Sequence, residues 1–217
     1  MISLDKLWAD AQAMIAGRDE GRPLDPMTEA LVQLAVHASA TSLDTAGIDS
    51  YIAKALEAGA TAAQIQDTLM IISALGVHTL MEGAPRLARQ LRASGDVGMT
   101  GPLNEQQKAL WEKYIGDDPY WAAMEQEVPD FLDSLLRLSP HAFEAFFQYC
   151  AVPWKSKALP LLTKELISLA ADATPTHRYL PGFRLHVANA LKLGAGRRAI
   201  LQTLDIAARA PLHQGVP

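Results

Sequence analysis

The chain has 217 residues, enough to bury a large core as one domain or as two fused small ones. It is 49% hydrophobic and 20% charged, with a net charge of −5 and no basic run, which argues against a nucleic-acid partner. No apolar stretch reaches membrane-spanning length, and the first residues lack the basic and then apolar pattern of a signal peptide. We therefore expect a cytoplasmic protein without a membrane partner. The single cysteine, Cys150, excludes an intramolecular disulfide.

Apolar residues recur at helical spacing along the whole chain, and no segment alternates as a strand does, so the sequence predicts an all-α fold. Pro85 is expected to interrupt its helix, and Phe143, Phe146 and Phe147 are expected in a core. In chain order, the predicted helices span about 3–16, 27–40, 46–58, 61–76, 79–93, 103–114, 120–127 and 129–138, then a short helix from 140, and 161–174, 181–193 and 197–210.

The sequence contains one helical pattern twice. Residues 27–82 align without a gap on residues 162–217, at an offset of 135, and seventeen of the fifty-six positions are identical. Self-similarity at a fixed offset indicates a duplication. It predicts a first copy at 1–96, a helical connector at 97–158 and a second copy at 159–217. Side chains kept by both copies are candidates for scaffold, and those kept by one are candidates for chemistry.

The second copy concentrates polar side chains around one loop and two helix ends, and the first copy retains almost none of them. Imidazole suits proton transfer near neutral pH, a carboxylate can orient it, and arginine can hold an anionic substrate. Two histidines at equivalent positions, His78 and His213, are shared by both copies and are further candidates for substrate contact. The residues particular to the second copy are Glu165, His177, Arg178, Tyr179, Arg184 and His186.

Most of these residues also have a purely structural interpretation, and the shared His78 and His213 could equally be scaffold or subunit contacts. His186 lies on an apolar helix face and could be a hydrogen-bonded core histidine, while His177 could cap a helix. Glu165 could complement a helix N-terminus, and Arg178 and Arg184 could face solvent. No pair of histidines has the spacing of a helical zinc motif, so we expect no metal.

The segment KELISLAADATPTHRYLPGFRLHVANALKLGAG resembles the carboxymuconolactone decarboxylase family, which includes the AhpD-type alkylhydroperoxidases. The first copy looks like a more diverged unit of the same kind, so the resemblance implies two tandem AhpD-like helical units. The peroxidase branch carries a redox Cys-x-x-Cys before the histidine that aligns with His186. Here those two places hold Tyr179 and Gly182, so we do not expect thiol peroxidase activity.

The decarboxylase branch needs no cysteine and no cofactor. The resemblance therefore implies a lyase that removes CO₂ from a small carboxylated unsaturated lactone, within a homodimer or homotrimer of the fused chain. His186 would be the general acid, with His177 and Tyr179 as hydrogen-bond donors, Glu165 orienting an imidazole and Arg184 holding a carboxylate. Two alternatives stay open: another cofactor-free lyase, isomerase or cyclase acting on a biosynthetic intermediate, and a non-enzymatic binding or assembly module.

Overall fold

The computed structural model describes residues 2–216, and within this range every regular element is a helix, as the sequence predicts. None of the helices in this range is long and apolar enough to cross a bilayer. The α-helices are α1 (Leu4–Ile15), α2 (Pro26–Ala38), α3 (Thr45–Glu57), α4 (Ala62–Ser73), α5 (His78–Ala93), α6 (Glu105–Tyr114), α7 (Pro119–Glu127), α8 (Phe131–Leu138), α9 (Pro140–Lys155), α10 (Leu161–Ala173), α11 (Leu180–Lys192) and α12 (Arg197–Ala208), with 3₁₀ turns η1 (Ala74–Val77) and η2 (Val97–Met99).

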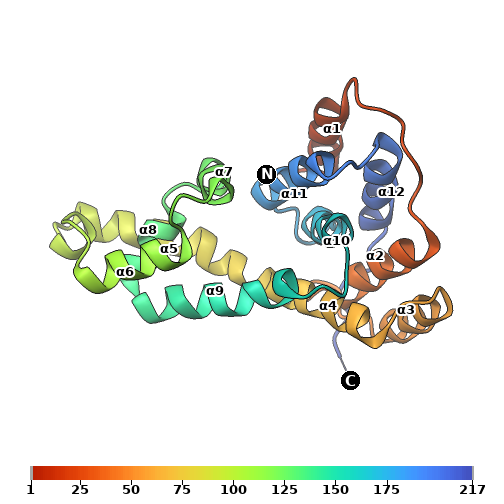
Figure 1. Ribbon diagram of the computed structural model, residues 1–217, viewed down its shortest axis with the longest axis horizontal. Coiled ribbons are helices and arrows are strands. Elements are labelled where there is room, and N and C mark those ends of the chain that lie inside the picture. Colours follow the sequence, from red (N-terminus) through yellow and green to blue (C-terminus); the bar gives the residue numbers. More distant parts are fainter. Residues whose placement is uncertain (1, 217) are drawn as a thin grey trace. The chain divides into compact units, whose positions relative to one another are not determined.

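The chain forms two compact units (Figure 1). The larger unit combines the residues up to Leu75 with those from Pro153 onward, and the smaller unit comprises Gly76–Val152. These compact units do not coincide with the segments predicted from the sequence repeat, which are 1–96, 97–158 and 159–217. The predicted segments describe the duplication of the sequence, and they stay a prediction. Both predicted copies contribute helices to the larger unit.

Two groups of three helices build most of the larger unit. We call α2, α3 and α4 the first trio, and α10, α11 and α12 the second trio. Each helix of the second trio has the same length as its counterpart and begins 135 residues after it. This agreement supports the interpretation of the sequence repeat as a duplication.

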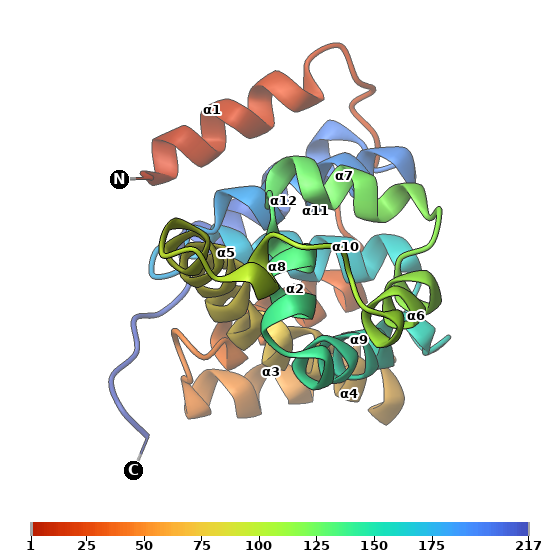
Figure 2. The same ribbon diagram turned by 90° about the vertical axis from the view of Figure 1, so that its left-hand side faces the viewer.

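The core of the larger unit lies between α2 and α10, which pack against each other. Figure 1 shows α10 in the interior, with α2, α11 and α12 around it and α1 outside, and Figure 2 likewise shows α1 along the edge of the unit. Small residues at matched positions, Ala35 and Ala170, allow the two central helices to approach closely, because neither side chain extends beyond Cβ. Their leucine neighbours Leu31, Leu34, Leu166 and Leu169 are at most 2% exposed.

Helix starts in the larger unit follow from capping residues in the sequence. The Asp25 carboxylate accepts hydrogen bonds from the backbone N–H groups of Met27 and Thr28, and Pro26 occupies the first turn of α2. Thr61 and Gln64 form a reciprocal capping box at the start of α4. Gly59 and Gly194 follow α3 and α11 with φ of +92°, where glycine ends a helix without steric cost.

The smaller unit has its own aromatic core and an internal polar network. Phe143, Phe146 and Phe147 are buried, as the sequence predicts, and the ring of Tyr114 stacks on Phe147. The interruption predicted at Pro85 is wrong: α5 runs without a break through this residue. The buried Ala84 and Ala88 beside it pack the helix, and this packing offsets the one backbone hydrogen bond that proline cannot make.

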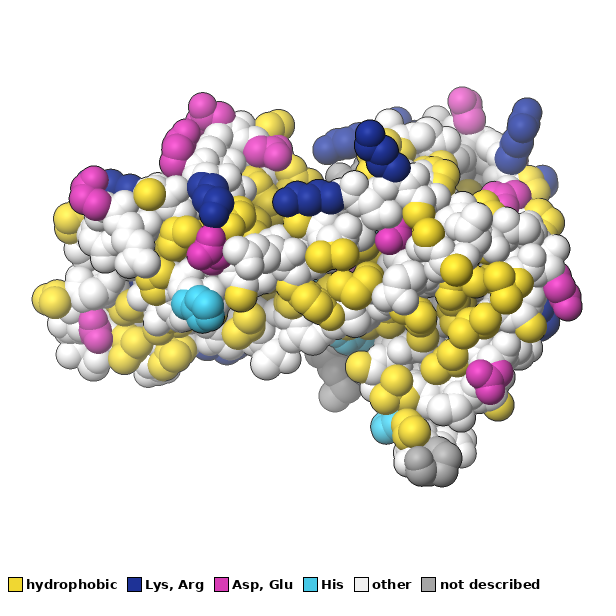
Figure 3. Space-filling view, turned by 60° about the horizontal axis from the view of Figure 1, so that its bottom comes forward, with side chains coloured by type: hydrophobic (Ala, Val, Ile, Leu, Met, Phe, Trp, Pro, Cys, Tyr) yellow, Lys and Arg dark blue, Asp and Glu magenta, His cyan; other side chains and the backbone are white. Residues whose placement is uncertain are grey.

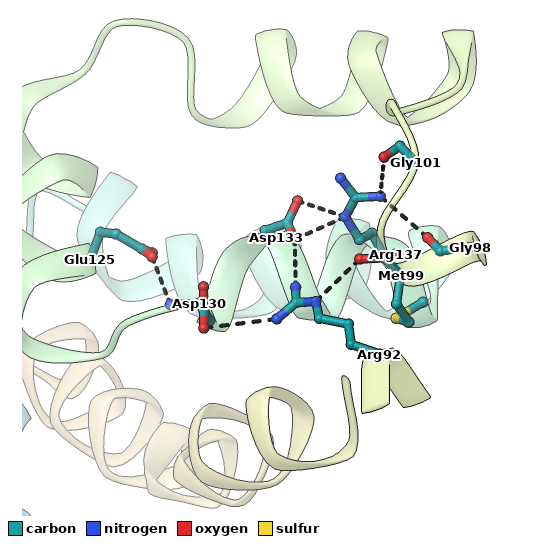
Figure 4. A network of polar contacts seen from close by, with 8 residues as sticks. All are labelled: Arg92, Gly98, Met99, Gly101, Glu125, Asp130, Asp133 and Arg137. Atoms are coloured by element: carbon teal, nitrogen blue, oxygen red, sulfur yellow. Dashed lines mark hydrogen bonds and ion pairs between the residues drawn. The ribbon is translucent and has the colours of Figure 1, made fainter. Parts of the chain in front are cut away.

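Figure 4 shows Asp133 on α8 between two arginines of the same unit. Arg92 Nη2 donates to Asp133 Oδ2 at 3.1 Å, and Arg137 Nε donates to the same carboxylate at 2.8 Å. The two guanidinium groups also donate to the backbone carbonyls of Met99 and Gly101. The network therefore ties the segment after α5 to α8.

Candidate functional site

A carboxylate and an imidazole of the second trio are in direct contact. Glu165 lies in the second turn of α10 and is 6% exposed, and its Oε2 is 2.7 Å from Nδ1 of His186 on α11. Asn189, one turn after His186, donates from Nδ2 to Glu165 Oε1 at 3.3 Å. Both carboxylate oxygens are thus engaged, and the imidazole is fixed through Nδ1 with Nε2 on its other side.

A second carboxylate lies on that other side. Asp172 follows Glu165 by seven residues, two turns along the same face of α10, and is 1% exposed. Its Oδ2 is 3.9 Å from His186 Nε2, and its Oδ1 is 3.6 Å from His177 Nε2. The four groups form a row in which carboxylates and imidazoles alternate.

The loop between α10 and α11 places His177 and Tyr179. The backbone N–H groups of His177 and Arg178 both donate to the carbonyl of Thr174, and the N–H of Tyr179 donates to the carbonyl of Asp172 at 2.9 Å. Arg178 has a φ of +49°, a left-handed conformation that is unfavourable for a residue with a side chain. The hydrogen bonds around the loop hold this strained turn in place.

Gly182 is required for the close approach of this loop to α11. A Cβ at this position would lie 2.1 Å from Asp172 Oδ2 and 3.1 Å from a ring carbon of Tyr179. A side chain would therefore displace the buried carboxylate from the imidazoles.

Burial and charge shift the proton affinities of the row in different directions. Burial alone would lower the pKa of His186, but the hydrogen bond and charge of Glu165, together with the charge of Asp172, outweigh it and raise that pKa. Burial raises the pKa of Asp172 to about 7, against the opposing effect of His186. Burial lowers the pKa of His177. Near neutral pH, the row thus contains a carboxyl group close to its midpoint and a neutral imidazole, and His186 binds its proton more tightly than an isolated imidazole does.

Aromatic rings flank the row. The indole of Trp154 is parallel to the imidazole of His186 within 3°, with ring centroids 6.5 Å apart. The phenol of Tyr179 lies beside His177 at 5.9 Å between centroids and is 9% exposed. These rings supply apolar surface next to the polar row, which is the usual composition of a small-molecule site.

The structure brings Glu165, His177, Tyr179 and His186 together. Two other predicted residues, Arg184 and His213, instead form hydrogen bonds with groups outside the row. Arg184 donates from Nε and Nη2 to Asp10 Oδ2 on α1, at 2.9 and 2.7 Å.

His213, the second of these two, lies with Nδ1 3.0 Å from the carbonyl oxygen of Ser42. Arg178 lies on the loop itself, and His78 begins α5 of the smaller unit. The substrate contacts predicted for these four residues stay predictions.

Sequence reasoning missed Asp172 and Asn189. Asp172 lies within the apolar run LISLAADA, seven residues after Glu165 and on the same helix face. An acid at this spacing in an apolar helix indicates a second buried carboxyl group beside Glu165. Asn189 follows His186 by three residues and shares its face of α11.

Comparison with known proteins agrees with the resemblance predicted from the sequence. Residues 140–212 match the model of the Carboxymuconolactone decarboxylase family. A crystal structure of a proposed gamma-carboxymuconolactone decarboxylase subunit from Burkholderia xenovorans is similar to this chain, with a TM-score of 0.72 and 28% sequence identity over 95% of this chain and 90% of that chain. A search of curated proteins found no match. The predicted family resemblance is therefore confirmed, and the matched segment contains the whole row from Glu165 to His186.

Proposed function

We propose that the protein is a cofactor-independent lyase that decarboxylates a small unsaturated lactone acid at the row of the second trio. Residues 140–212 match the model of the carboxymuconolactone decarboxylase family, which supports this proposal. The observation that carries this proposal is the position of His186 between two carboxyl groups, with Glu165 at Nδ1 and Asp172 facing Nε2.

In the proposed reaction, the bond between the substrate carbon and its carboxylate breaks and CO₂ leaves. The electron pair stays in the conjugated lactone as an enolate, which needs electrostatic stabilisation and then a proton on carbon. The His186 imidazolium supplies that proton from Nε2, because its Nδ1–H is held by Glu165. One proton is consumed in each turnover.

Asp172 would return the proton to His186. A carboxyl group with a pKa of about 7 is protonated in part at neutral pH, and it contacts both imidazoles of the row. His177, kept neutral by burial, and Tyr179 would donate hydrogen bonds to the enolate oxygen. Trp154 would cover the flat substrate with apolar surface.

Thiol peroxidase chemistry is a poor fit for this chain. Burial raises the pKa of the Cys150 thiol to about 11, so the nucleophilic thiolate is scarce at neutral pH. Cys150 also lies on α9, outside the row.

Turnover of 4-carboxymuconolactone, followed by the loss of ultraviolet absorbance, tests the proposal. We expect wild type to turn over and His186→Gln to lose about 10²–10⁴-fold in kcat, the range typical of a general acid. His141→Gln, an exposed histidine of α9, is the matched control and should retain activity. A folded His186→Gln variant with unchanged kcat would refute the assignment of the acid.

The alternatives require the same assay with more substrates. Absence of turnover by wild type on this lactone and on related carboxylated lactones would remove the decarboxylase proposal. Proton exchange or isomerisation of such an acid, without CO₂ release, would favour a different cofactor-free lyase or isomerase.

The predicted homo-oligomer is open to direct measurement by light scattering. Figure 3 shows hydrophobic side chains among the polar ones on one face of the molecule, and the exposed leucines of the larger unit include Leu56, Leu161 and Leu193.

A further inference from the structure

Three repeat positions hold an aspartate, a tyrosine and a histidine in the second trio, and the first trio has the same three residue types at these positions in a different order. His37 takes the position of Asp172, Asp44 that of Tyr179 and Tyr51 that of His186, each at the offset of 135. The comparison of sequences concealed this set, because no single position keeps its residue. The structure brings the three side chains of the first trio together.

His37 and Asp44 are in direct contact. Nδ1 of His37 on α2 is 2.7 Å from Oδ2 of Asp44, the residue before α3. The hydrogen bond from His37 and the backbone N–H of Gly47 lower the pKa of Asp44, so the carboxylate is ionised and engaged. As in the second trio, a carboxylate fixes an imidazole through Nδ1.

The backbone around this pair matches that of the second trio. Leu43 has a φ of +43°, and it is the counterpart of the strained Arg178. A Cβ at Gly47 would lie 2.0 Å from His37 Nδ1 and 2.4 Å from Asp44 Oδ2, as a Cβ at Gly182 would meet Asp172. An ion pair that is partly open to solvent adds little to the stability of a fold, whereas the left-handed backbone at Leu43 opposes folding. Stability is therefore a weak reason for this arrangement.

Tyr51 and Lys54 lie next to the pair of His37 and Asp44, and they add an aromatic ring and a positive charge to it. The rings of His37 and Tyr51 are 4.8 Å apart between centroids, and Lys54 Nζ lies 4.3 Å from the centroid of the Tyr51 ring. The phenol thus lies near both an imidazole and an ammonium group. The side chain of His37 is 17% exposed and that of Asp44 is 34% exposed, so a ligand can reach them.

We propose that the first trio holds a second ligand site, distinct from the row of the second trio, that binds a small conjugated carboxylate. Asp44 is already engaged by His37 and by backbone N–H, and within residues 2–216 no acidic side chain forms an ion pair with Lys54. The ammonium of Lys54 and the imidazole of His37 would hold the carboxylate, and the Tyr51 ring would stack on the conjugated part of the ligand. The occupant is therefore an unsaturated or aromatic acid.

Imidazole NMR during titration with trans,trans-muconate tests this site. We expect saturable shifts of the His37 ring signals, with an affinity in the range of about 0.1–1 mM that befits a few polar contacts. Lys54→Gln should weaken the affinity about tenfold, and Tyr51→Ala by a similar factor. His141→Gln is the control and should leave the affinity unchanged.

The same titration on His186→Gln separates this proposal from the proposed function, because it reads binding at His37 in a variant that is expected to lack turnover. Shifts at His37 that persist in this variant support the second site whatever the outcome of the lactone assay. Linear shifts without saturation, or saturable shifts unaffected by both Lys54→Gln and Tyr51→Ala, would overturn it.

Discussion

The two trios of the larger unit differ mainly in how deeply they bury their acid. In the second trio, the side chain of Asp172 is 2% exposed, its pKa is raised to about 7 and it faces two imidazoles. In the first trio, the side chain of Asp44 is 34% exposed, has a lowered pKa and faces one imidazole. An acid that shares a proton near neutral pH suits catalysis, whereas a permanently ionised one suits orientation and binding. The comparison teaches that one helical scaffold can raise or lower the pKa of a buried or partly buried carboxyl group when the residue types change places.

The largest expected effect is on kcat, and it should follow when the carboxylate in contact with His186 in the second trio is neutralised. Glu165→Gln should lower kcat for the lactone about 10²-fold, because the amide supports the imidazolium less well than the carboxylate does. Loss of the charge also lowers the pKa of His186, so the basic limb of the pH–rate profile should move to lower pH. An unchanged profile in a folded variant would show that Glu165 does not act through His186.

Alanine at the two matched glycines should destabilise both trios. Gly182→Ala and Gly47→Ala each force a methyl group into a polar contact, and overpacking of this kind costs about 1–3 kcal/mol in the free energy of unfolding. Urea denaturation measures the effect.

Gly83→Ala on α5 is the control for these two variants. No atom lies within 4 Å of a Cβ added at Gly83, so the usual helix preference for alanine should stabilise the protein by about 0.5–1 kcal/mol. Stabilisation by all three changes would contradict the packing described for the two sites.

Neutralising the two aspartates should change stability in opposite directions. The pKa of Asp172 is raised in the folded protein, so the unfolded chain releases this proton at lower pH and stability falls as pH rises from about 4 to about 7. Asp172→Asn removes that penalty and should stabilise the protein by about 1–3 kcal/mol at pH 8, with no gain at pH 4.

The pKa of Asp44 is lowered, so its contribution to stability is present above the unfolded pKa and lost as pH falls through the folded pKa. Asp44→Asn should therefore cost about 0.5–1 kcal/mol at pH 7, a small value because the pair is partly exposed to solvent. Thermal unfolding at pH 4, 7 and 8 measures both variants. A loss of stability at pH 8 in Asp172→Asn would show that the folded protein favours its charged form.

The smallest expected effect concerns α1, which packs on α11 and α12 of the second trio. Arg184 links α11 to Asp10, whose pKa is lowered by its hydrogen bonds with Lys6 and Arg184. Arg184→Ala should reduce stability by about 0.5 kcal/mol at low salt and by less at high salt. An unchanged midpoint in urea would contradict the anchoring role. A tenfold rise in KM would instead favour the carboxylate contact predicted from the sequence.

Much of the fold follows from the sequence because helical periodicity and caps act locally. The apolar spacing of Leu31 and Leu34, and the glycine after α3, place the helices of both trios within a few residues of their observed ends. Pro85 is the exception, since tertiary packing keeps α5 continuous. The division into two units could not be predicted in the same way, because it depends on contacts between segments that lie far apart in the sequence.

The candidate site was predictable in part for the same reason. Glu165 and His186 follow from a family resemblance and from residues present in one copy only. Asp172 and His37 were missed because each lies within an otherwise apolar stretch of a predicted core helix, away from the loop on which the search for polar residues concentrated. Arg184 could not be placed, since its partner Asp10 lies 174 positions away in the chain.

The most direct test of the account is the kcat for 4-carboxymuconolactone of wild type, His186→Gln and the control His141→Gln, measured on samples with matched thermal unfolding. The account predicts turnover by wild type and by the control, and a loss of about 10²-fold or more in His186→Gln. Equal turnover by all three proteins, or none by wild type, would contradict the claim that the second trio is a decarboxylase site.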